Sequence, residues 1–285
     1  MDIEAYNQIR SGGAGFHEQK RGVIAVWGME AVQFLDGMIT NDMKTLEDGQ
    51  QMLAAFPNAQ GRLLAVVRVL RQGDRFLFET EEATREKLFQ NLFRFTYAGD
   101  FFVEDLSEKY RYFDVFGDSV FDVDGALKFK GRGAEGWFVQ IETENALEGV
   151  AIDDETFETL RIEAGIPKFG IDMDETTIVP ELGFPEMISY TKGCYVGQEI
   201  IARIHFRGHV AKQLTGLISE EPLNAGDELT SPDGKPAGRV TSAAISPGLE
   251  KSVAIALVRY DHLTPGTELR SGDRRVEVTQ LPSIE

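Results

Sequence analysis

Residues 192–199 read Lys192-Gly193-Cys194-Tyr195-Val196-Gly197-Gln198-Glu199 and hold the one cysteine of this 285-residue chain. Glycine lies directly before the cysteine and again three residues after it, and glycine permits tight turns and close approach to the backbone. Residues 198–204 favour a helix, so the sequence predicts that Cys194 lies in a loop just before a helix. Free backbone N–H groups at the helix start, with Lys192 nearby, would stabilise a thiolate.

Cys194 is therefore a candidate reactive thiol for redox, sulfur or metal chemistry, with Lys192 as the cation that tunes it. The residues alone leave a second interpretation open, because an unpaired cysteine is often a small buried hydrophobic residue. A single cysteine excludes an internal disulfide and, by itself, a cysteine-ligated iron–sulfur site.

The chain is acidic, with 29 lysine and arginine residues against 47 aspartate and glutamate residues and a net charge of −18. Nucleic acids require several basic residues on one face, so direct nucleic-acid binding is not expected. No apolar run approaches the roughly 18 residues of a membrane helix, and the start Met1-Asp2-Ile3-Glu4 does not resemble a secretory signal. We expect a soluble, cytoplasmic protein without membrane contact.

Residues 1–208 mix strands and helices without a regular alternation. The expected strands are residues 22–27, 51–56, 63–70, 75–80, 101–103, 110–116 and 137–141, and the expected helices are residues 29–37, 82–95 and 153–164. Thr80 is a candidate N-cap for the second of these helices, and Asp153 or Asp154 for the third. Residues 128–136 are expected to form a glycine-rich hairpin loop. This pattern is typical of the α+β class rather than of a doubly wound sheet.

Residues 209–285 show almost no helical periodicity. Short apolar runs alternate with turn clusters such as Pro232-Asp233-Gly234 and Ser246-Pro247-Gly248. Such spacing is typical of a small β-barrel or sandwich of about 75 residues. We therefore expect two domains, an α+β module over residues 1–208 and a β-barrel over residues 209–285.

The octet 192–199 matches the K-G-C-Y-x-G-Q-E signature of the YgfZ/GcvT family of folate-binding proteins, and the chain resembles this family over most of its length. The other stretches that resemble it are Phe34-Leu35-Asp36-Gly37, Thr40-Asn41-Asp42, Asn58-Ala59-Gln60-Gly61-Arg62, Arg161-Ile162-Glu163-Ala164-Gly165-Ile166-Pro167 and the barrel segments 238–240 and 254–259. The resemblance implies a ring-shaped, aminomethyltransferase-like module with a central channel, followed by a small β-barrel. It also implies tetrahydrofolate or a derivative as ligand, and iron–sulfur client or assembly proteins, tRNA-thiolating enzymes among them, as partners.

Several residues acquire roles from this resemblance. Glu163 occupies the position of the pterin-binding glutamate of related aminomethyltransferases, and a carboxylate can accept two N–H donors from a pterin edge. Arg161 and Asn41 are further cofactor-binding candidates, although Arg161 could simply pack or pair and Asn41 could simply bond a turn. Arg203, with Arg207, could attract a folate polyglutamate tail or form a structural salt bridge. The motif around the thiol is completed by Gly193, Tyr195, Gly197, Gln198 and Glu199.

One departure from the family bears on the reaction. Aminomethyltransferases carry an Asp-Asp pair after the N-x-x-G turn, the first Asp being the acid–base group, and this chain has Ala65 and Val66 there. Apolar side chains cannot exchange a proton, so we expect a folate binder that supports assembly or repair of iron–sulfur clusters through Cys194. The alternatives are a folate-dependent aminomethyltransferase or demethylase, and a non-catalytic adaptor.

No metal site is expected. His205 and His209 are four residues apart and would align on a helix, but no third ligand is evident near them and arginines crowd the same segment. The central prediction is instead that Cys194 and Glu163 open onto one cavity wide enough for a pterin.

Overall fold

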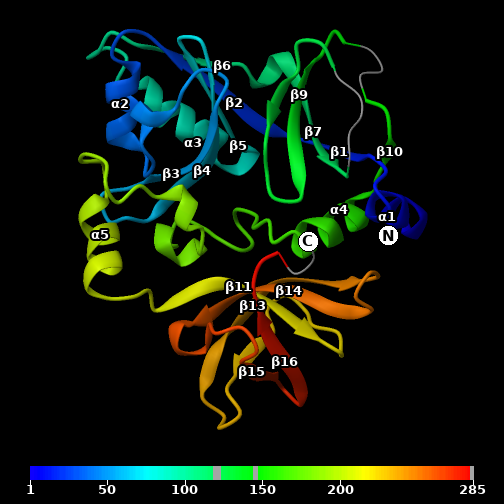
Figure 1. The fold of residues 1–285 in the computed structure, drawn as a ribbon. Coiled ribbons are helices and arrows are strands. Elements are labelled where there is room, and N and C mark those ends of the chain that lie inside the picture. Colours follow the sequence, from blue (N-terminus) through cyan, green and yellow to red (C-terminus); the bar gives the residue numbers. More distant parts are fainter. Residues whose placement is uncertain (118–122, 144–146, 283–285) are drawn as a thin grey trace.

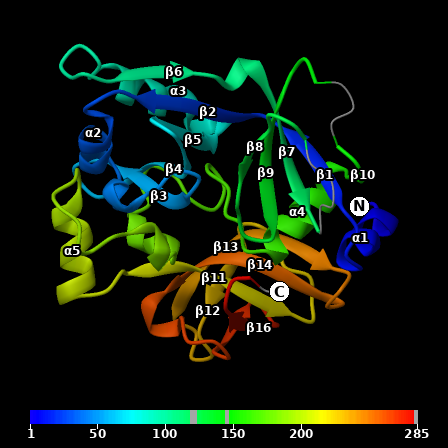
Figure 2. The same ribbon diagram turned by 45° about the horizontal axis from the view of Figure 1, so that its top comes forward.

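The computed structural model describes residues 1–117, 123–143 and 147–282. Two sheets and a barrel are arranged around a common centre, with the barrel below both sheets in Figure 1. The three parts remain distinct in the turned view of Figure 2. The α+β class and the C-terminal barrel predicted from the sequence are confirmed.

The first sheet has the antiparallel strand order β3-β4-β5-β2-β6. Its strands are β2 (Arg21–Trp27), β3 (Gln51–Pro57), β4 (Leu63–Gln72), β5 (Arg75–Glu81) and β6 (Phe102–Asp105), and the helices that cover one face are α2 (Ala31–Met38) and α3 (Glu82–Phe93). Successive side chains of a strand point to opposite faces. In β2, Ile24 and Val26 therefore pack under the helices, whereas Val23 and Ala25 face the second sheet.

The second sheet has the strand order β10-β1-β7-β9-β8. Its strands are β1 (Gly15–Gln19), β7 (Tyr110–Phe116), β8 (Leu127–Phe129), β9 (Ala134–Gln140) and β10 (Val150–Ala151), and the helices beside it are α1 (Ile3–Arg10) and α4 (Asp154–Glu163). The long loop predicted over residues 128–136 is wrong, because Phe129 pairs with Gly136 and only residues 130–133 connect the two strands.

Of the two helix N-caps tested by the structure, the prediction for α4 is confirmed and the prediction for α3 is wrong. The carboxylate of Asp153 accepts a hydrogen bond from the Thr156 backbone N–H at 2.8 Å, as predicted for α4. Thr80 does not cap α3, because it lies inside β5 and its hydroxyl contacts the Thr84 hydroxyl at 2.8 Å. The helix begins after Glu81 instead.

The barrel closes in the order β11-β14-β13-β12-β15-β16. Its strands are β11 (Lys212–Ser219), β12 (Glu228–Thr230), β13 (Pro236–Ser246), β14 (Lys251–Arg259), β15 (Glu268–Ser271) and β16 (Arg274–Thr279). Helix α5 (Gln198–Arg207) precedes it, so the predicted boundary after residue 208 falls between α5 and β11. The barrel packs on the rest of the chain through Leu214 and Ile255, which contact a cluster that includes Ile162 and Met173.

Candidate functional site

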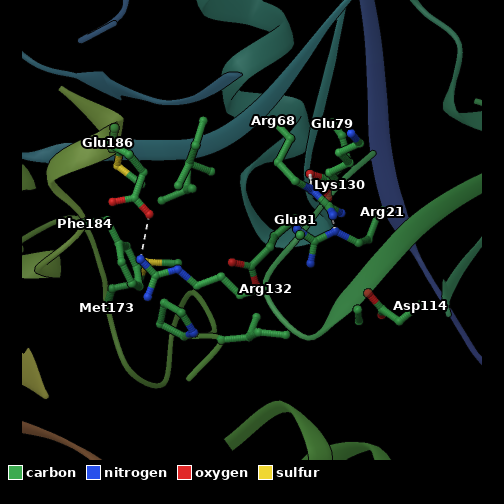
Figure 3. A pocket seen from close by; sticks show the side chains of 17 residues that line it. Arg21, Arg68, Glu79, Glu81, Asp114, Lys130, Arg132, Met173, Phe184 and Glu186 are labelled. Atoms are coloured by element: carbon green, nitrogen blue, oxygen red, sulfur yellow. Dashed lines mark hydrogen bonds and ion pairs between the residues drawn. The ribbon is translucent and has the colours of Figure 1, made fainter. Parts of the chain in front are cut away.

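A cavity of about 270 Å³ lies between the two sheets and the segment that runs from residue 166 to residue 187 (Figure 3). Charged side chains from β2, β4, β5 and β7 and from the β8–β9 loop line it, and Val66, Phe184 and Met187 contribute apolar surface. Such a mixture of apolar wall and a few convergent polar groups is typical of a small-molecule site.

One wall of the cavity is built around Glu79. Glu79 is 1% exposed, and its two carboxylate oxygens form ion pairs with Arg21 and with Arg68, the latter at 2.6 Å. Strand register produces this cluster, because Arg68 lies opposite Glu79 between β4 and β5. Burial opposes ionisation of Glu79, but the two guanidinium groups outweigh it and lower the pKa of the carboxyl.

Further contacts hold Arg68 in place. Its Nη2 donates to the Tyr112 hydroxyl at 2.8 Å, and that hydroxyl donates to Asp114 at 2.8 Å. Gly136 leaves room for the guanidinium, since a Cβ at this position would lie 2.3 Å from Arg68 Nη2. The sheets are thus joined by a connected polar network, which favours a rigid cavity wall.

Glu81 is the second carboxylate that β5 directs to the cavity, two residues after Glu79 on the same face. Both of its oxygens lie within hydrogen-bond distance of the Phe169 backbone N–H, at 3.0 and 3.1 Å. Within the described residues it forms no ion pair, and burial raises the pKa of its carboxyl. Glu81 was not predicted from the sequence, since a glutamate between a strand and a helix shows no local sign of facing a cavity.

At the opposite side of the cavity, Arg132 of the β8–β9 loop forms an ion pair with Glu186 at 2.6 Å. The Arg132 guanidinium also lies 4.2 Å from the centre of the Phe184 ring. Figure 3 shows Arg132 reaching toward both residues. This contact connects the second sheet to the segment that closes the cavity.

The residue that faces the cavity at the position of the transferase Asp-Asp pair is Val66. Ala65 is fully buried in the core under α2 and α3, because adjacent residues of β4 point to opposite faces. Neither side chain is ionisable, so the cavity has no acid–base group at this position.

The octet forms a loop before α5, as the sequence predicts. Cys194 is exposed, and α5 begins directly after Gly197. Gly197 has φ +80°, and a Cβ there would lie 2.4 Å from the Asn58 carbonyl oxygen. Only glycine allows the octet to pack this closely on the N-x-x-G turn.

Lys192 is buried and contacts the loop after α2. Its Nζ donates to the carbonyl oxygens of Asp36, Ile39 and Asn41 at 2.6, 3.0 and 2.6 Å, and it forms an ion pair with the Asp36 carboxylate at 3.1 Å. Burial lowers the pKa of Lys192, and Asp36 opposes that shift. These contacts make Lys192 an anchor for the octet, and its predicted effect on Cys194 stays a prediction.

Asn41 connects this anchor to the cavity wall. Its Nδ2 donates to the carbonyl oxygens of Leu53 at 2.8 Å and Glu186 at 2.9 Å, two residues that line the cavity. Its side-chain oxygen accepts from the Asp42 N–H at 3.0 Å. The contacts therefore match the turn-bonding alternative, and a pterin contact stays a prediction.

Glu163 and Arg161 lie on α4 and use their polar atoms within the protein. Glu163 is fully buried, accepts a hydrogen bond from the Tyr6 hydroxyl at 2.8 Å and forms an ion pair with Arg10. Arg161 bonds Asp172 at 3.1 Å and the Ser242 hydroxyl at 2.9 Å, which ties α4 to the barrel. Neither residue lines the cavity, so these contacts favour structural roles over the cofactor roles that the resemblance implies.

The remaining octet and helix residues are divided between core and surface. Tyr195 packs in the core cluster between the barrel and the rest of the chain, and Gln198 and Glu199 begin α5. Arg203 is exposed and pairs with Glu199 one turn earlier at 2.8 Å, which is the structural alternative considered for it. Phe206, which is 67% exposed, lies beside them on the outer face of α5.

The predicted shared cavity is not what the structure contains. Neither Cys194 nor Glu163 is among the residues that line the cavity. The thiol lies at the surface, however, rather than in sealed apolar packing. Its loop contacts the cavity wall through Lys192 and Asn41 and through Tyr195, which packs in one cluster with Met173, Phe184 and Met187.

His205 and His209 do not converge, because each stacks on a different tyrosine, Tyr190 at 3.6 Å and Tyr260 at 3.9 Å between ring centres. Across residues 1–117, 123–143 and 147–282, no group of three or more His, Cys, Asp or Glu side chains is placed to hold a metal ion. In the same residues, no helix has both the length and the apolar character needed to cross a membrane.

Two family models match the chain. The GCVT N-terminal domain matches residues 3–128, and the glycine cleavage T-protein C-terminal barrel domain matches residues 212–283. The solved structure of the glycine cleavage system aminomethyltransferase T from Bartonella henselae aligns with a TM-score of 0.85 at 20% identity, over 99% of this chain and 89% of that one. The fold is therefore that of the aminomethyltransferase T structure.

Three curated relatives have different names. The tRNA-modifying protein YgfZ of Escherichia coli O157:H7 is 26% identical over 287 residues, which cover 87% of this chain and 86% of that protein. The mitochondrial iron-sulfur cluster assembly factor IBA57 homolog of Mycosarcoma maydis is 26% identical over 69% of this chain, which spans 55% of the length of that relative. The aminomethyltransferase of Thermoanaerobacter pseudethanolicus is 23% identical over 94% of this chain and 84% of that protein.

Proposed function

Because this chain belongs to the family of proteins that combine a GCVT N-terminal domain with a glycine cleavage T-protein C-terminal barrel domain, we propose that it binds tetrahydrofolate or a derivative in the cavity between its sheets. We further propose that it supports assembly or repair of iron–sulfur clusters in client enzymes, tRNA-thiolating enzymes among them, with Cys194 as the essential thiol. The names of the YgfZ and IBA57 relatives support this role. A cytoplasmic location suits it, because an exposed thiol stays reduced there.

The residues of the cavity fit a reduced folate. Glu81 has lone pairs left to accept N–H donors from a pterin edge, and such donors would favour its ionised form. Val66, Phe184 and Met187 provide apolar surface for the ring faces. The folate part of the proposal rests on one observation: Glu81 lines the cavity and bonds only a backbone N–H among the described residues.

The exposed thiol supports a role toward partner proteins rather than toward the cavity ligand. Cys194 is open to solvent, and its loop is anchored by Lys192 to residues that also support the cavity wall. A client protein can therefore reach the sulfur without entering the cavity. Any effect on tRNA would pass through such a client, since the net charge of −18 disfavours direct contact with nucleic acid.

Folate binding is testable by thermal unfolding. A ligand at 100 times its Kd adds about 2.7 kcal/mol to the free energy of unfolding, so saturating 5-formyltetrahydrofolate should raise the Tm by roughly 5 °C or more. Glu81→Gln should increase the Kd, measured by calorimetry, about tenfold or more, because it removes a charge-assisted acceptor. An unchanged Tm in the wild-type protein would refute the proposal.

Glu163→Gln is the matched control for that substitution. It should leave the Kd unchanged and lower the Tm, because Glu163 is paired with Tyr6 and Arg10 away from the cavity. If instead Glu163→Gln weakens binding and Glu81→Gln does not, Glu163 is the pterin carboxylate that the family resemblance implies.

The alternative function is aminomethyl transfer, which the Thermoanaerobacter pseudethanolicus relative keeps open. Ala65, at the position of the catalytic aspartate, and Val66 beside it are both apolar, which argues against it. We expect the purified protein, supplied with tetrahydrofolate and an aminomethyl-loaded carrier protein, to release no ammonia above the rate without protein. Robust turnover would establish the transferase and overturn the argument from Ala65.

A further inference from the structure

Most charged side chains of the cavity wall already have partners of opposite charge. Asp114 has no ion pair but accepts hydrogen bonds from the side chains of Gln19 and Tyr112. Within the described residues, two charged side chains of the wall have no side-chain partner: Glu81, which accepts only a backbone N–H, and Lys130, whose ammonium group forms neither an ion pair nor a hydrogen bond. The other charged side chains of the wall are already engaged by ion pairs or hydrogen bonds with neighbouring side chains. Glu81 and Lys130 are therefore the charges that a ligand would meet.

These two residues differ in depth. Glu81 ends β5 and is partly buried, whereas Lys130 is an exposed residue at the start of the β8–β9 loop. The Lys130 backbone N–H donates to the side-chain oxygen of Gln51 at 2.8 Å, and the Gln51 amide donates to the Lys128 carbonyl oxygen at 2.7 Å. The start of the loop is thus fixed to β3 while the ammonium group stays free at the edge of the cavity.

We propose that Lys130 binds the carboxylates of the glutamate tail of a folate whose pterin edge contacts Glu81. The cavity would then select an elongated ligand with N–H donors at one end and a carboxylate at the other. This inference rests on the proposed function, and it assigns both the orientation of the ligand and a residue that determines specificity. Arg203, the sequence-based candidate for the tail, lies outside this cavity.

The test compares two ligands that differ only in the tail. Calorimetry would measure the Kd of 5-formyltetrahydrofolate and of 5-formyltetrahydropteroamide, in which an uncharged primary amide replaces the glutamate so that no carboxylate remains, for the wild-type protein and for Lys130→Gln. An ammonium–carboxylate contact near the surface corresponds to roughly a twofold to fivefold change in Kd. We expect Lys130→Gln to weaken the first ligand by that factor and to leave the second unchanged.

Lys109→Gln provides the matched control. It removes the same charge from an exposed lysine that pairs with Glu104 and does not line the cavity, so it reports the general effect of making an acidic protein more acidic. Equal Kd changes in Lys130→Gln and Lys109→Gln, or equal weakening of both ligands, would overturn the inference while folate binding still stands. If the wild-type protein binds neither ligand, the proposed function fails and this inference fails with it.

Discussion

Replacing Glu79 with glutamine is expected to lower the free energy of unfolding by about 3–5 kcal/mol. The substitution keeps the shape of the side chain but removes the charge that compensates Arg21 and Arg68, whose side chains are only 19% and 14% exposed. Breaking a buried ion pair is costly because the remaining charge has lost its hydration without a replacement. Chemical denaturation at neutral pH would measure the change.

Glu104→Gln is the surface counterpart of Glu79→Gln. Glu104 pairs with Lys109 at 2.8 Å, but the two side chains are 41% and 61% exposed, so its loss should cost less than about 1 kcal/mol. A similar small effect for Glu79→Gln would show that the Arg21–Glu79–Arg68 cluster does not hold the cavity wall together.

Replacing Cys194 with serine is expected to remove support for iron–sulfur client enzymes while leaving the fold and folate binding intact. A serine hydroxyl does not ionise near neutral pH, whereas a cysteine thiol supplies some nucleophilic thiolate. In cells that lack the native gene, we expect the activity of a tRNA-thiolating client to fall roughly tenfold or more with Cys194→Ser. The Tm and the Kd for 5-formyltetrahydrofolate should match the wild type, because the side chain is exposed.

Val196→Ser separates the chemistry of the thiol from the shape of its loop. Val196 lies two residues away and is 38% exposed, so its substitution perturbs the same loop but keeps the sulfur. We expect it to retain client activity. Full activity of Cys194→Ser would contradict a thiol mechanism and favour the adaptor alternative.

Local patterns predicted most elements of the fold because they depend on neighbours along the chain. The β-branched run of β2, the capped start of α4 and the turn-punctuated strands of the barrel were all evident from the sequence. Helix α1 was missed, although Asp2 caps it by accepting a hydrogen bond from the Ala5 N–H at 3.0 Å. That cap, followed by buried Tyr6 and Ile9 at helical spacing, is the signal that could have revealed it.

The missed helix also explains why the site was only partly predicted. Glu163 is bonded by Tyr6 and Arg10 of α1. These partners lie more than 150 residues away in the chain, so the sequence around Glu163 does not indicate the contact. Glu81 and Lys130 escaped notice for the same reason, since their positions at the cavity depend on strand alternation combined with the packing of two sheets. In an acidic chain, the residues next to a glutamate along the sequence do not show whether its side chain faces a cavity or the solvent.

The amino-acid sequence by itself determined the family, the α+β class with its terminal barrel, and the glycine-flanked loop of Cys194 before a helix, because these follow from motifs and short-range periodicity. Only the tertiary structure decided which charges meet. Arg21 and Glu79 are 58 residues apart in the chain and pair across the first sheet. Such contacts arise from strand register and from the packing of separate elements, which no short stretch of sequence encodes.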